Sequence, residues 1–167
     1  MIYELYDFLS PKECEQYIDI INTNTHVVPF TDNGNFTNNK WRDIEQTELF
    51  YKRLETFNLC DNILRPNNII MSGKYKVGDS FSIHTDTGLY YDKDKKEKTR
   101  WTLLIYLNDN FEGGETVFYN DKWIANKIVQ PKEGMAILFD IDLWHKANPL
   151  LKGEKYWIGC EIIGYFK

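Results

Sequence analysis

Two side chains that can bind a metal lie two residues apart in this sequence, His84 and Asp86. They fall in a stretch predicted to be a β-strand over residues 80–86. Side chains two residues apart in a strand point to the same face, so the imidazole and the carboxylate would lie side by side. One further histidine would complete the facial triad that suits Fe(II) in oxygenases. On its own, the His-x-Asp pattern is weak evidence for a metal site.

His145 is the best candidate for the third ligand among the three histidines of the chain. It follows residues 135–139, an apolar run predicted to be a buried strand in the second half of the β-rich region. A core histidine bonded to the backbone is the alternative interpretation of His145. His26 has no carboxylate near it in a strand pattern, and we expect it on the surface or in a loop.

Lys155 begins the apolar strand predicted over residues 155–165. A lysine in this position usually faces solvent at the end of its strand. Inside a dry barrel it would instead need an anion to offset the cost of desolvation, and a dicarboxylate could supply that anion. Both interpretations remain open at this point.

A short strand over residues 2–8 and then two helices are predicted before the main run of strands. Residues Ser10 to Glu13 have the pattern of a helix start with a capping box, in which Ser10 is the N-cap and Pro11 lies in the first turn. The apolar face of this helix consists of Cys14, Tyr17, Ile18 and Ile21. Residues 31–40 are turn formers, which predicts a mobile loop. A second helix is predicted over 44–58, with a core-packing stripe of Ile44, Leu49, Phe50, Leu54 and Phe57.

From residue 67 the hydrophobic pattern changes from helical to strand-like. Short runs rich in β-branched and aromatic residues alternate with turn formers, at 68–76, 80–86, 101–107, 115–120, 127–130, 135–140, 143–147 and 155–165. Short strands without intervening helices predict an antiparallel barrel or jelly roll. The expected fold class is therefore mainly β with flanking N-terminal helices (α+β). We expect one domain over 1–167, in which 1–66 support a core formed by 67–167.

Composition narrows the classes of partner and location. The net charge of −5 argues against a general phosphate-binding surface, and the basic residues between Lys93 and Arg100 are interleaved with acidic ones. Three widely spaced cysteines, Cys14, Cys60 and Cys160, form no disulfide framework and favour a reducing compartment. With no basic and apolar leader at the start and no run long enough to span a membrane, we expect a soluble, cytoplasmic protein.

Taken together, the motifs resemble the prolyl 4-hydroxylase branch of the 2-oxoglutarate oxygenases. The matching elements are Tyr75-x-x-Gly78-x-x-Phe81-x-x-His84-x-Asp86, Thr102 to Asn108, Glu112-Gly113-Gly114-Glu115-Thr116-x-Phe118, Pro131-x-x-Gly134 before His145, and Gly153-Glu154-Lys155 after it. Their order and spacing agree across about 70–167, and Phe8 to Cys14 also resembles the start of the family. Each element alone is weak, but the joint match is highly specific.

The resemblance implies a double-stranded β-helix, also called a jelly-roll barrel, with the site in its mouth. His84, Asp86 and His145 would bind Fe(II) and serve as the catalytic centre, and Lys155 would pair with the C5 carboxylate of 2-oxoglutarate. Tyr75, Thr116 and Tyr106 would donate hydrogen bonds to this cosubstrate; packing of the barrel is the alternative for these three. O₂ would be the second cosubstrate, with ascorbate as a candidate auxiliary reductant. Residues 87–99 would lie where the family has a lid.

Two departures from the family pattern bear on the substrate. The family often has a tryptophan six residues after the lysine, where this chain has Glu161. It also often has an arginine three residues before the strand threonine; here that position is Thr99, and Arg100 comes one residue later. Glu161 would bring negative charge to the face that Lys155 occupies, unless it is paired.

The expected reaction is hydroxylation of an unactivated C–H, foremost in a prolyl residue of a peptide or protein, with release of succinate and CO₂. We expect the peptide near Trp101, Tyr119 and Trp144. The alternatives are hydroxylation of a free amino acid or other small molecule, and a catalytically silent barrel that binds metal or peptide. The expected partners exclude nucleic acid and membranes, and we expect a monomer.

Overall fold

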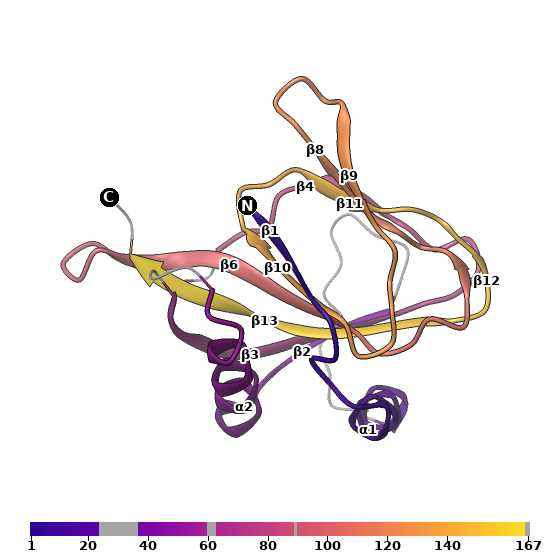
Figure 1. The fold of residues 1–167 in the computed structure, drawn as a ribbon, viewed down its shortest axis with the longest axis horizontal. Helices are drawn as coiled ribbons and strands as arrows, with labels where there is room; N and C mark the ends of the chain where they lie inside the picture. The colour runs from indigo at the N-terminus through magenta and orange to yellow at the C-terminus, as the bar shows by residue number, and fades with distance from the viewer. Residues whose placement is uncertain (24–36, 60–62, 89, 166–167) are drawn as a thin grey trace.

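The computed structural model describes residues 1–23, 37–59, 63–88 and 90–165, and it consists of three layers. Two helices pack on one face of a large antiparallel sheet, and a small antiparallel sheet lies on the opposite side (Figure 1). The expected jelly-roll architecture is confirmed, although the sheets do not close into a continuous barrel.

The large sheet has seven strands, and six of them follow one path. Their order is β1 (Ile2–Leu5), β10 (Ala136–Asp140), β6 (Glu97–Tyr106), β13 (Lys155–Tyr165), β3 (Ile63–Tyr75) and β2 (Thr37–Arg42), and β5 (Tyr91–Asp92) pairs with β6. The small sheet runs β4 (Phe81–His84), β11 (His145–Ala147), β8 (Thr116–Tyr119) and β9 (Ala125–Val129). A further pair joins β7 (Glu112–Gly113) to β12 (Leu150–Lys152).

The helices begin at the caps that their sequences specify. Helix α1 (Pro11–Thr23) has the predicted capping box: the Ser10 backbone N–H donates to the Glu13 carboxylate at 2.8 Å, and the Glu13 N–H donates back to the Ser10 hydroxyl at 3.4 Å. Helix α2 (Ile44–Glu55) begins at Asp43, whose carboxylate accepts from the Gln46 N–H at 2.9 Å. Both caps bind N–H groups that have no partner inside the helix.

Alternation along the central strands divides the core into two layers. On β13, Tyr156, Ile158, Cys160 and Ile162 belong to the layer beneath the helices, as do Leu103 and Ile105 of β6. The alternate residues of these strands therefore face the small sheet. They include Thr102, Tyr106, Lys155 and Glu161, all of them buried. This inner face of the large sheet positions the candidate site.

The predicted strands all exist, but four short strands were not predicted. They are β2, β5, β7 and β12, all at or near the edges of sheets. The mobile loop expected over 31–40 is wrong for residues 37–40, which belong to β2; the rest of that loop lies outside the described residues, as does His26. In α2 the expected buried stripe is wrong at Ile44 and Leu49, which are 50% and 47% exposed, because only the side bearing Phe50 and Leu54 meets the sheet.

The segment expected to form a loop over the site is a hairpin. Tyr91 and Asp92 of β5 pair with Lys98 and Glu97 of β6, and the Asp92 carboxylate accepts from the backbone N–H groups of Asp94 and Lys95 at 3.1 Å each. An aspartate that accepts from the N–H groups two and three residues further along stabilises a tight turn. Residues 90–99 are therefore a hydrogen-bonded element; Leu89 lies outside the described residues.

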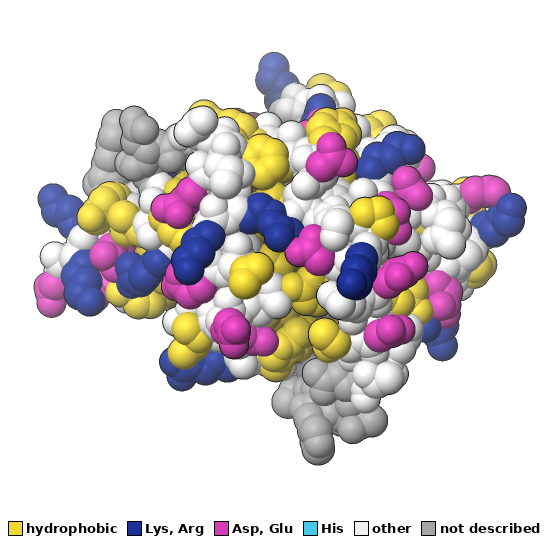
Figure 2. Space-filling model, turned by 60° about the horizontal axis from the view of Figure 1, so that its bottom comes forward, with side chains coloured by type: hydrophobic (Ala, Val, Ile, Leu, Met, Phe, Trp, Pro, Cys, Tyr) yellow, Lys and Arg dark blue, Asp and Glu magenta, His cyan; other side chains and the backbone are white. Residues whose placement is uncertain are grey.

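Figure 2 shows the molecule with its helix side turned toward the viewer. This face carries charges of both signs. Acidic and basic side chains are interspersed there, without a continuous basic region among the described residues shown. Among the described residues, no helix is long and apolar enough to cross a membrane.

Arg53 links α2 to α1 and to the turn between β1 and α1. Its guanidinium donates to the Phe8 carbonyl at 2.7 Å and to the Glu13 carboxylate at 2.8 Å. We predict that Arg53→Ala lowers the free energy of unfolding by about 1.5–3 kcal/mol, the range for hydrogen bonds to charged groups. Lys52→Ala, on the exposed side of the same helix, should change it by less than about 0.5 kcal/mol in the same denaturation experiment.

The pH dependence provides a second test of the same contact. The hydrogen bond from Arg53 is the main reason that the pKa of Glu13 falls from 4.5 to about 2. The ion pair therefore stabilises the fold above pH 4.5, and its contribution is lost as the pH falls toward 2. The difference between wild type and Arg53→Ala should shrink over that interval; an equal difference at pH 7 and pH 2 would contradict the assignment.

Candidate metal centre and cosubstrate pocket

The structure brings His84, Asp86 and His145 together, with one ligand atom from each residue within 4.8 Å of the others. The Asp86 Oδ1 atom lies 3.5 Å from His84 Nε2 and 3.8 Å from His145 Nε2. His84 and His145 are direct partners across the antiparallel pair β4–β11. This cross-strand register places both histidines on one face. The strand predicted over 80–86 ends at His84, and Asp86 lies two residues past that end, beside the two histidines.

Backbone carbonyls orient both imidazole rings. His84 Nδ1 lies 2.7 Å from the Ser82 carbonyl oxygen, and His145 Nδ1 lies 2.9 Å from the Leu143 carbonyl oxygen. A carbonyl can only accept, so each Nδ1 carries the proton and each Nε2 keeps its lone pair. Both lone pairs then point toward the space that Asp86 Oδ1 also faces. Such hydrogen bonds are typical of histidines that bind metals.

Thr102 fixes the carboxylate of Asp86. Its hydroxyl, from β6 of the large sheet, donates to Asp86 Oδ2 at 2.5 Å, while Oδ1 faces the histidines. Burial by itself raises the pKa of Asp86, but its polar contacts with His84, His145 and Thr102 outweigh that effect and lower the pKa. Burial lowers the pKa of His145. The anionic carboxylate and neutral imidazole that result are the forms in which these groups bind metals.

The donor set fits a divalent iron ion. Two neutral imidazoles and one carboxylate on one side form the arrangement used by non-haem Fe(II) oxygenases, in which other coordination positions remain open. The ligand atoms are already grouped, and each has a hydrogen-bonded partner behind it. The three residues could therefore hold a metal without rearrangement of their strands.

Lys155 lies inside the molecule at the start of β13, with a relative exposure of 2%. Its ammonium nitrogen donates to the Gly114 carbonyl at 2.6 Å and lies 5.1 Å and 5.3 Å from the ring centres of Tyr75 and Tyr106. Burial lowers the pKa of Lys155 to about 7, and the nearby charge of Glu115 opposes that shift. Of the two interpretations of this lysine, the buried one is therefore correct.

The other predicted cosubstrate residues surround Lys155. Tyr75 is its cross-strand partner on β3, and the hydroxyls of Tyr106 and Thr116 are hydrogen-bonded to each other at 2.7 Å. Gly114 leaves room for the lysine, because a Cβ there would lie 3.2 Å from Lys155 Cδ and its φ of +68° disfavours other residues. Lys155, Tyr75, Tyr106 and Thr116 thus form a buried cluster, the lysine cluster, with one ammonium and three hydroxyl groups.

The register of β8 relates the lysine cluster to the triad. Phe118 pairs with His145, and Thr116 pairs with Ala147. Residues two apart in a strand share a face and are separated by roughly 7 Å. Thr116 therefore lies on the same inner face as His145, two residues along the sheet from it. A five-carbon dicarboxylate is long enough to bridge such a separation between the triad and the lysine cluster.

Other residues singled out in the sequence lie elsewhere. Trp101 is 3% exposed in the core beneath the helices, so its expected place beside a substrate is wrong. Trp144 is 38% exposed and packs against Trp123, with ring centres 4.8 Å apart. Glu161 is buried, and its carboxylate accepts hydrogen bonds from the Asn67 amide at 2.8 Å and the Thr99 hydroxyl at 3.4 Å.

Sequence reasoning missed the role of Thr102. Thr102 belongs to one of the family motifs, but the sequence predicts no contact for it. Its hydrogen bond to Asp86 joins two segments whose relative position the sequence does not give. The signal that could have revealed it is alternation: Thr102 is a polar residue at an inner-facing position of the strand, between the apolar residues Trp101 and Leu103.

A jelly roll with a partly buried His-Asp-His cluster on the same inner face as a buried lysine is the arrangement of non-haem iron oxygenases. The sequence profile of the 2OG-Fe(II) oxygenase superfamily matches residues 70–160, more than half of the chain. The chain belongs to this superfamily, whose members use Fe(II) and 2-oxoglutarate, and its resemblance to the prolyl hydroxylase branch is confirmed.

Relatives and solved structures agree with this assignment. A PKHD-type hydroxylase of Pseudomonas putida is 29% identical over 86 residues, which cover 49% of this chain and 37% of the relative. A probable prolyl 4-hydroxylase of Arabidopsis thaliana is 30% identical over 120 residues, covering 54% of this chain and 41% of the relative. The chain thus spans half or less of the length of the curated relatives it matches.

The fold is shared with known prolyl hydroxylases. A viral collagen prolyl hydroxylase of Paramecium bursaria Chlorella virus-1, solved with 2-oxoglutarate, has a TM-score of 0.70 at 22% identity, covering 98% of this chain and 96% of that one. A Trichoplax adhaerens prolyl hydroxylase, solved with a peptide of hypoxia inducible factor, has a TM-score of 0.67 at 17% identity, covering 99% and 83%.

The lowered pKa of Lys155 predicts a pH dependence of stability in the absence of cosubstrate. The unfolded chain binds a proton on this lysine up to its ordinary pKa of 10.5, whereas the folded chain releases it above about 7. The contribution of Lys155 to stability should therefore rise by at most about 1.4 kcal/mol per pH unit above pH 7. Lys155→Met should be the more stable protein at pH 7, and its advantage should shrink by pH 9. A constant difference in denaturation midpoint would contradict this.

Proposed function

We propose that this protein is a 2-oxoglutarate-dependent dioxygenase in which His84, Asp86 and His145 bind Fe(II) and Lys155 binds the distal carboxylate of 2-oxoglutarate. The observation that carries the proposal is the meeting of three ligand atoms within 4.8 Å on the inner face that also bears the buried lysine. A buried lysine near a group of metal ligands suits an anion with two carboxylates, one for the lysine and one that could bind the metal.

Each of these residues has a distinct part in the reaction. The two histidines and Asp86 would hold the metal, and Thr102 keeps Asp86 Oδ1 directed toward the Nε2 atoms of the histidines. Tyr106 and Thr116 offer hydroxyl groups to the cosubstrate, and Tyr75 shields Lys155 from water. When bound, Fe(II) with 2-oxoglutarate and O₂ supplies the oxidising chemistry, and the protein contributes positioning and a dry site.

A prolyl residue in a peptide or protein is the proposed substrate, with succinate and CO₂ as the other products. Support comes from the prolyl hydroxylases among the relatives and structural neighbours, one of them solved with a peptide. A free amino acid remains the second candidate, because the family's tryptophan position carries the buried Glu161 in this chain. A cytoplasmic location and a monomeric state stay predictions of the sequence.

Oxygen transfer and the triad can be tested together. Fe(II)-loaded protein given 2-oxoglutarate, O₂ and proline-rich peptides or free L-proline should form succinate and add one oxygen atom to its substrate by mass spectrometry. His84→Ala, Asp86→Ala and His145→Ala should each abolish both products, because losing a metal ligand costs more than the roughly 10–100-fold in affinity typical of its supporting residues. Unchanged activity in all three would refute the metal assignment; oxidation of proline but of no peptide would overturn the peptide substrate.

The charge of Lys155 should control cosubstrate affinity. Because the pKa of Lys155 is about 7, binding a dicarboxylate above that pH requires uptake of one proton. We predict that the Kd of 2-oxoglutarate for anaerobic Mn(II)-loaded protein rises about tenfold per pH unit between pH 7.5 and 9. In Lys155→Arg, whose guanidinium stays protonated, this dependence should vanish. A Kd that does not change with pH in the wild type would place the lysine outside the cosubstrate site.

A further inference from the structure

Two exposed tryptophans, the tryptophan pair, lie at the end of the small sheet that carries the candidate metal ligands. Trp123, in the turn between β8 and β9, is 57% exposed, and Trp144, directly before β11, is 38% exposed. Their ring centres are 4.8 Å apart, and the ring planes are inclined at 49°. Ile124 and Ile128 of the same hairpin are each more than half exposed. Large apolar side chains gathered on a surface in this way mark a site of interaction.

The turn between β8 and β9 holds Trp123 in its exposed place. The side-chain oxygen of Asn120 accepts hydrogen bonds from the N–H groups of Lys122 and Ile124 at 3.0 Å each, and its carbonyl accepts from the Trp123 N–H at 2.9 Å. Trp123 has a φ of +61°, in the left-handed region that hairpin turns usually fill with glycine. A bulky residue is strained there, and strained positions of this kind concentrate at functional surfaces.

The tryptophan pair and the candidate metal ligands lie at the same end of the small sheet. β11 is antiparallel to β4 and β8, so its start at His145 lies beside the end of β4 at His84 and near the end of β8 at Tyr119. The Tyr119 N–H donates to the Trp144 carbonyl at 2.9 Å, and the hairpin projects from there (Figure 1). Trp144 directs its ring to the turn, whereas its neighbour His145 directs Nε2 toward Asp86. A chain that lies on the pair can therefore continue to the triad.

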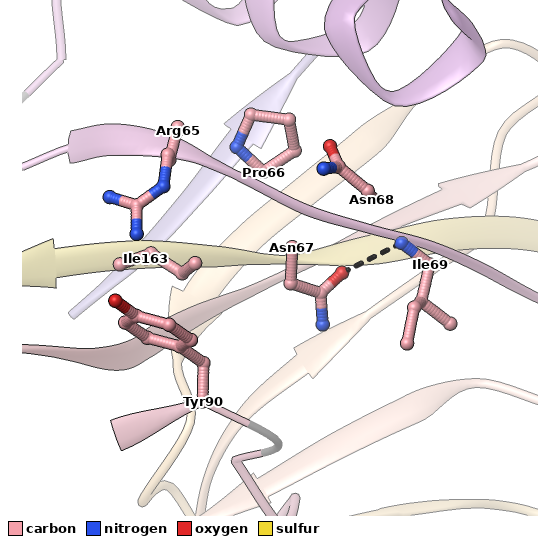
Figure 3. A pocket seen from close by; sticks show the side chains of 7 residues that line it. All are labelled: Arg65, Pro66, Asn67, Asn68, Ile69, Tyr90 and Ile163. Atoms are coloured by element: carbon pink, nitrogen blue, oxygen red, sulfur yellow. Dashed lines mark hydrogen bonds between the residues drawn. The ribbon is translucent and has the colours of Figure 1, made fainter. Parts of the chain in front are cut away.

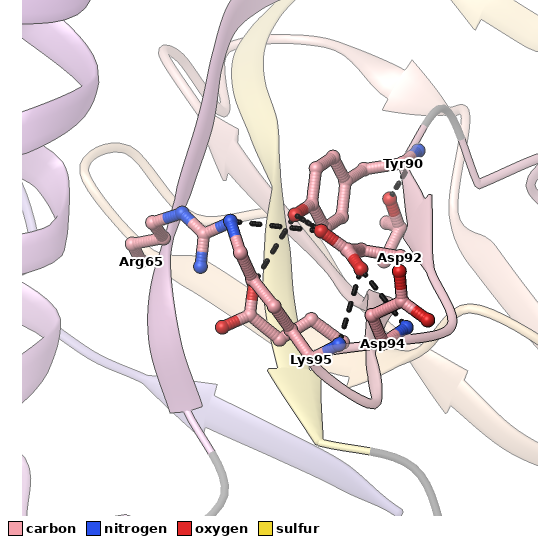
Figure 4. Close-up of polar contacts among 7 residues, drawn as sticks. Arg65, Tyr90, Asp92, Asp94 and Lys95 are labelled. Atoms are coloured by element: carbon pink, nitrogen blue, oxygen red, sulfur yellow. Dashed lines mark hydrogen bonds and ion pairs between the residues drawn. The ribbon is translucent and has the colours of Figure 1, made fainter.

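A cavity between β3, β13 and the residue before β5 is the competing place for the flanking residues of a peptide. Its volume is about 210 Å³, and Arg65, Asn67 and Tyr90 are among the side chains that line it (Figure 3). Arg65 pairs with Glu97 at 2.8 Å, and the Tyr90 hydroxyl donates toward Glu97 and Asp92 at 3.2 Å and 3.3 Å (Figure 4). These contacts engage Arg65 and Tyr90 within the protein, and the volume is below the roughly 300–1,000 Å³ of pockets for whole ligands. The tryptophan pair is the better surface for an extended chain.

The size of the surface favours an extended segment over a second copy of the chain. A stable protein interface buries about 800 Å² on each partner. Two indoles and two isoleucines that are about half exposed supply less, since a fully buried aromatic side chain covers only about 150–250 Å². A polyproline II segment needs less area, because it is extended before it binds and its rings are apolar. Surfaces lined by aromatic side chains are the usual receptors for such segments.

We propose that the tryptophan pair binds a proline-rich segment of the peptide substrate, in polyproline II conformation, several residues away from the prolyl residue that reacts. The inference rests on the proposed function, since it takes a peptide as the substrate. Long side chains that leave neighbouring Cα atoms in different directions end roughly 10–15 Å apart. Polyproline II advances about 3.1 Å per residue, so about three to five residues would span that distance. The pair adds affinity by holding the peptide near the triad, without touching the metal.

Binding to the pair can be measured without turnover. The probes are a capped decapeptide of proline and a capped decapeptide of alternating glycine and serine, each titrated into the protein with no metal or cosubstrate added. The proline probe should bind more tightly than the glycine-serine probe. Trp123→Gly should weaken binding of the proline probe about five- to tenfold, because it removes an aromatic contact. It should also leave the fold intact, because glycine suits the φ of this position.

Two further variants separate the aromatic surface from a general effect of substitution. Trp123→Phe keeps an aromatic ring and should retain most of the affinity for the proline probe. Tyr165→Ala removes an exposed aromatic side chain at the end of β13, in the large sheet, and is the matched control. It should leave binding of both probes unchanged.

Turnover separates the pair from the metal centre. In the reaction of the proposed function, a prolyl peptide with a proline-rich extension should have a lower KM than one of equal length with a glycine-serine extension. Trp123→Gly should remove this difference and leave kcat unchanged, because the pair touches neither the metal nor the reacting residue.

The outcomes distinguish the proposals. The inference is wrong if the wild type binds both probes equally, if Trp123→Gly binds the proline probe as tightly as the wild type, or if the difference in KM persists in Trp123→Gly. Self-association that Trp123→Gly abolishes, without binding of the proline probe, would assign the surface to a second copy and overturn the inference. Binding that depends on Trp123, in a protein that oxidises no prolyl peptide, would uphold the surface and refute only the prolyl substrate.

Discussion

The antiparallel pairing of β11 with β4 and β8 is the interaction on which the rest of the site depends. It sets His145 opposite His84 and places both on the face shared with Asp86. Because side chains alternate along a strand, a shift of one residue would turn His145 outward and break up the ligand set. The same strand pairing places Thr116 two residues along the sheet from the position opposite His145. The positions of the triad and of the lysine cluster therefore depend on one strand register.

The large sheet supplies the other half of the site through its inner face. Three polar residues lie there: Lys155 at the start of β13, and further along the strand Glu161 beside its cross-strand partner Thr102. Burying polar and charged side chains costs free energy unless each finds a partner. Gly114, Asp86 and Asn67 provide those partners. The sheet can therefore bury these three polar side chains on its inner face while its helix-side face packs an apolar core.

Much of this could be predicted from the sequence, for identifiable reasons. The spacing of His84 and Asp86 and the scarcity of histidine indicated the triad, because strand periodicity relates nearby residues directly. The position of Lys155 was ambiguous until the fold showed it buried. Trp101 was misplaced because an aromatic residue in a strand fits either face, and only the packing of the helices decides between them. The contacts of Thr102 and Glu161 join distant segments, which periodicity cannot relate.

The central claim is that triad and lysine form one site for a metal and a dicarboxylate. A crystal structure of the protein with Mn(II) and 2-oxoglutarate, grown without O₂, tests it most directly. The account predicts a single metal ion bound by Nε2 of His84 and His145 and by Oδ1 of Asp86, with the distal carboxylate of 2-oxoglutarate on the Lys155 ammonium. A metal ion bound elsewhere, or a cosubstrate whose distal carboxylate lies away from Lys155, would contradict it.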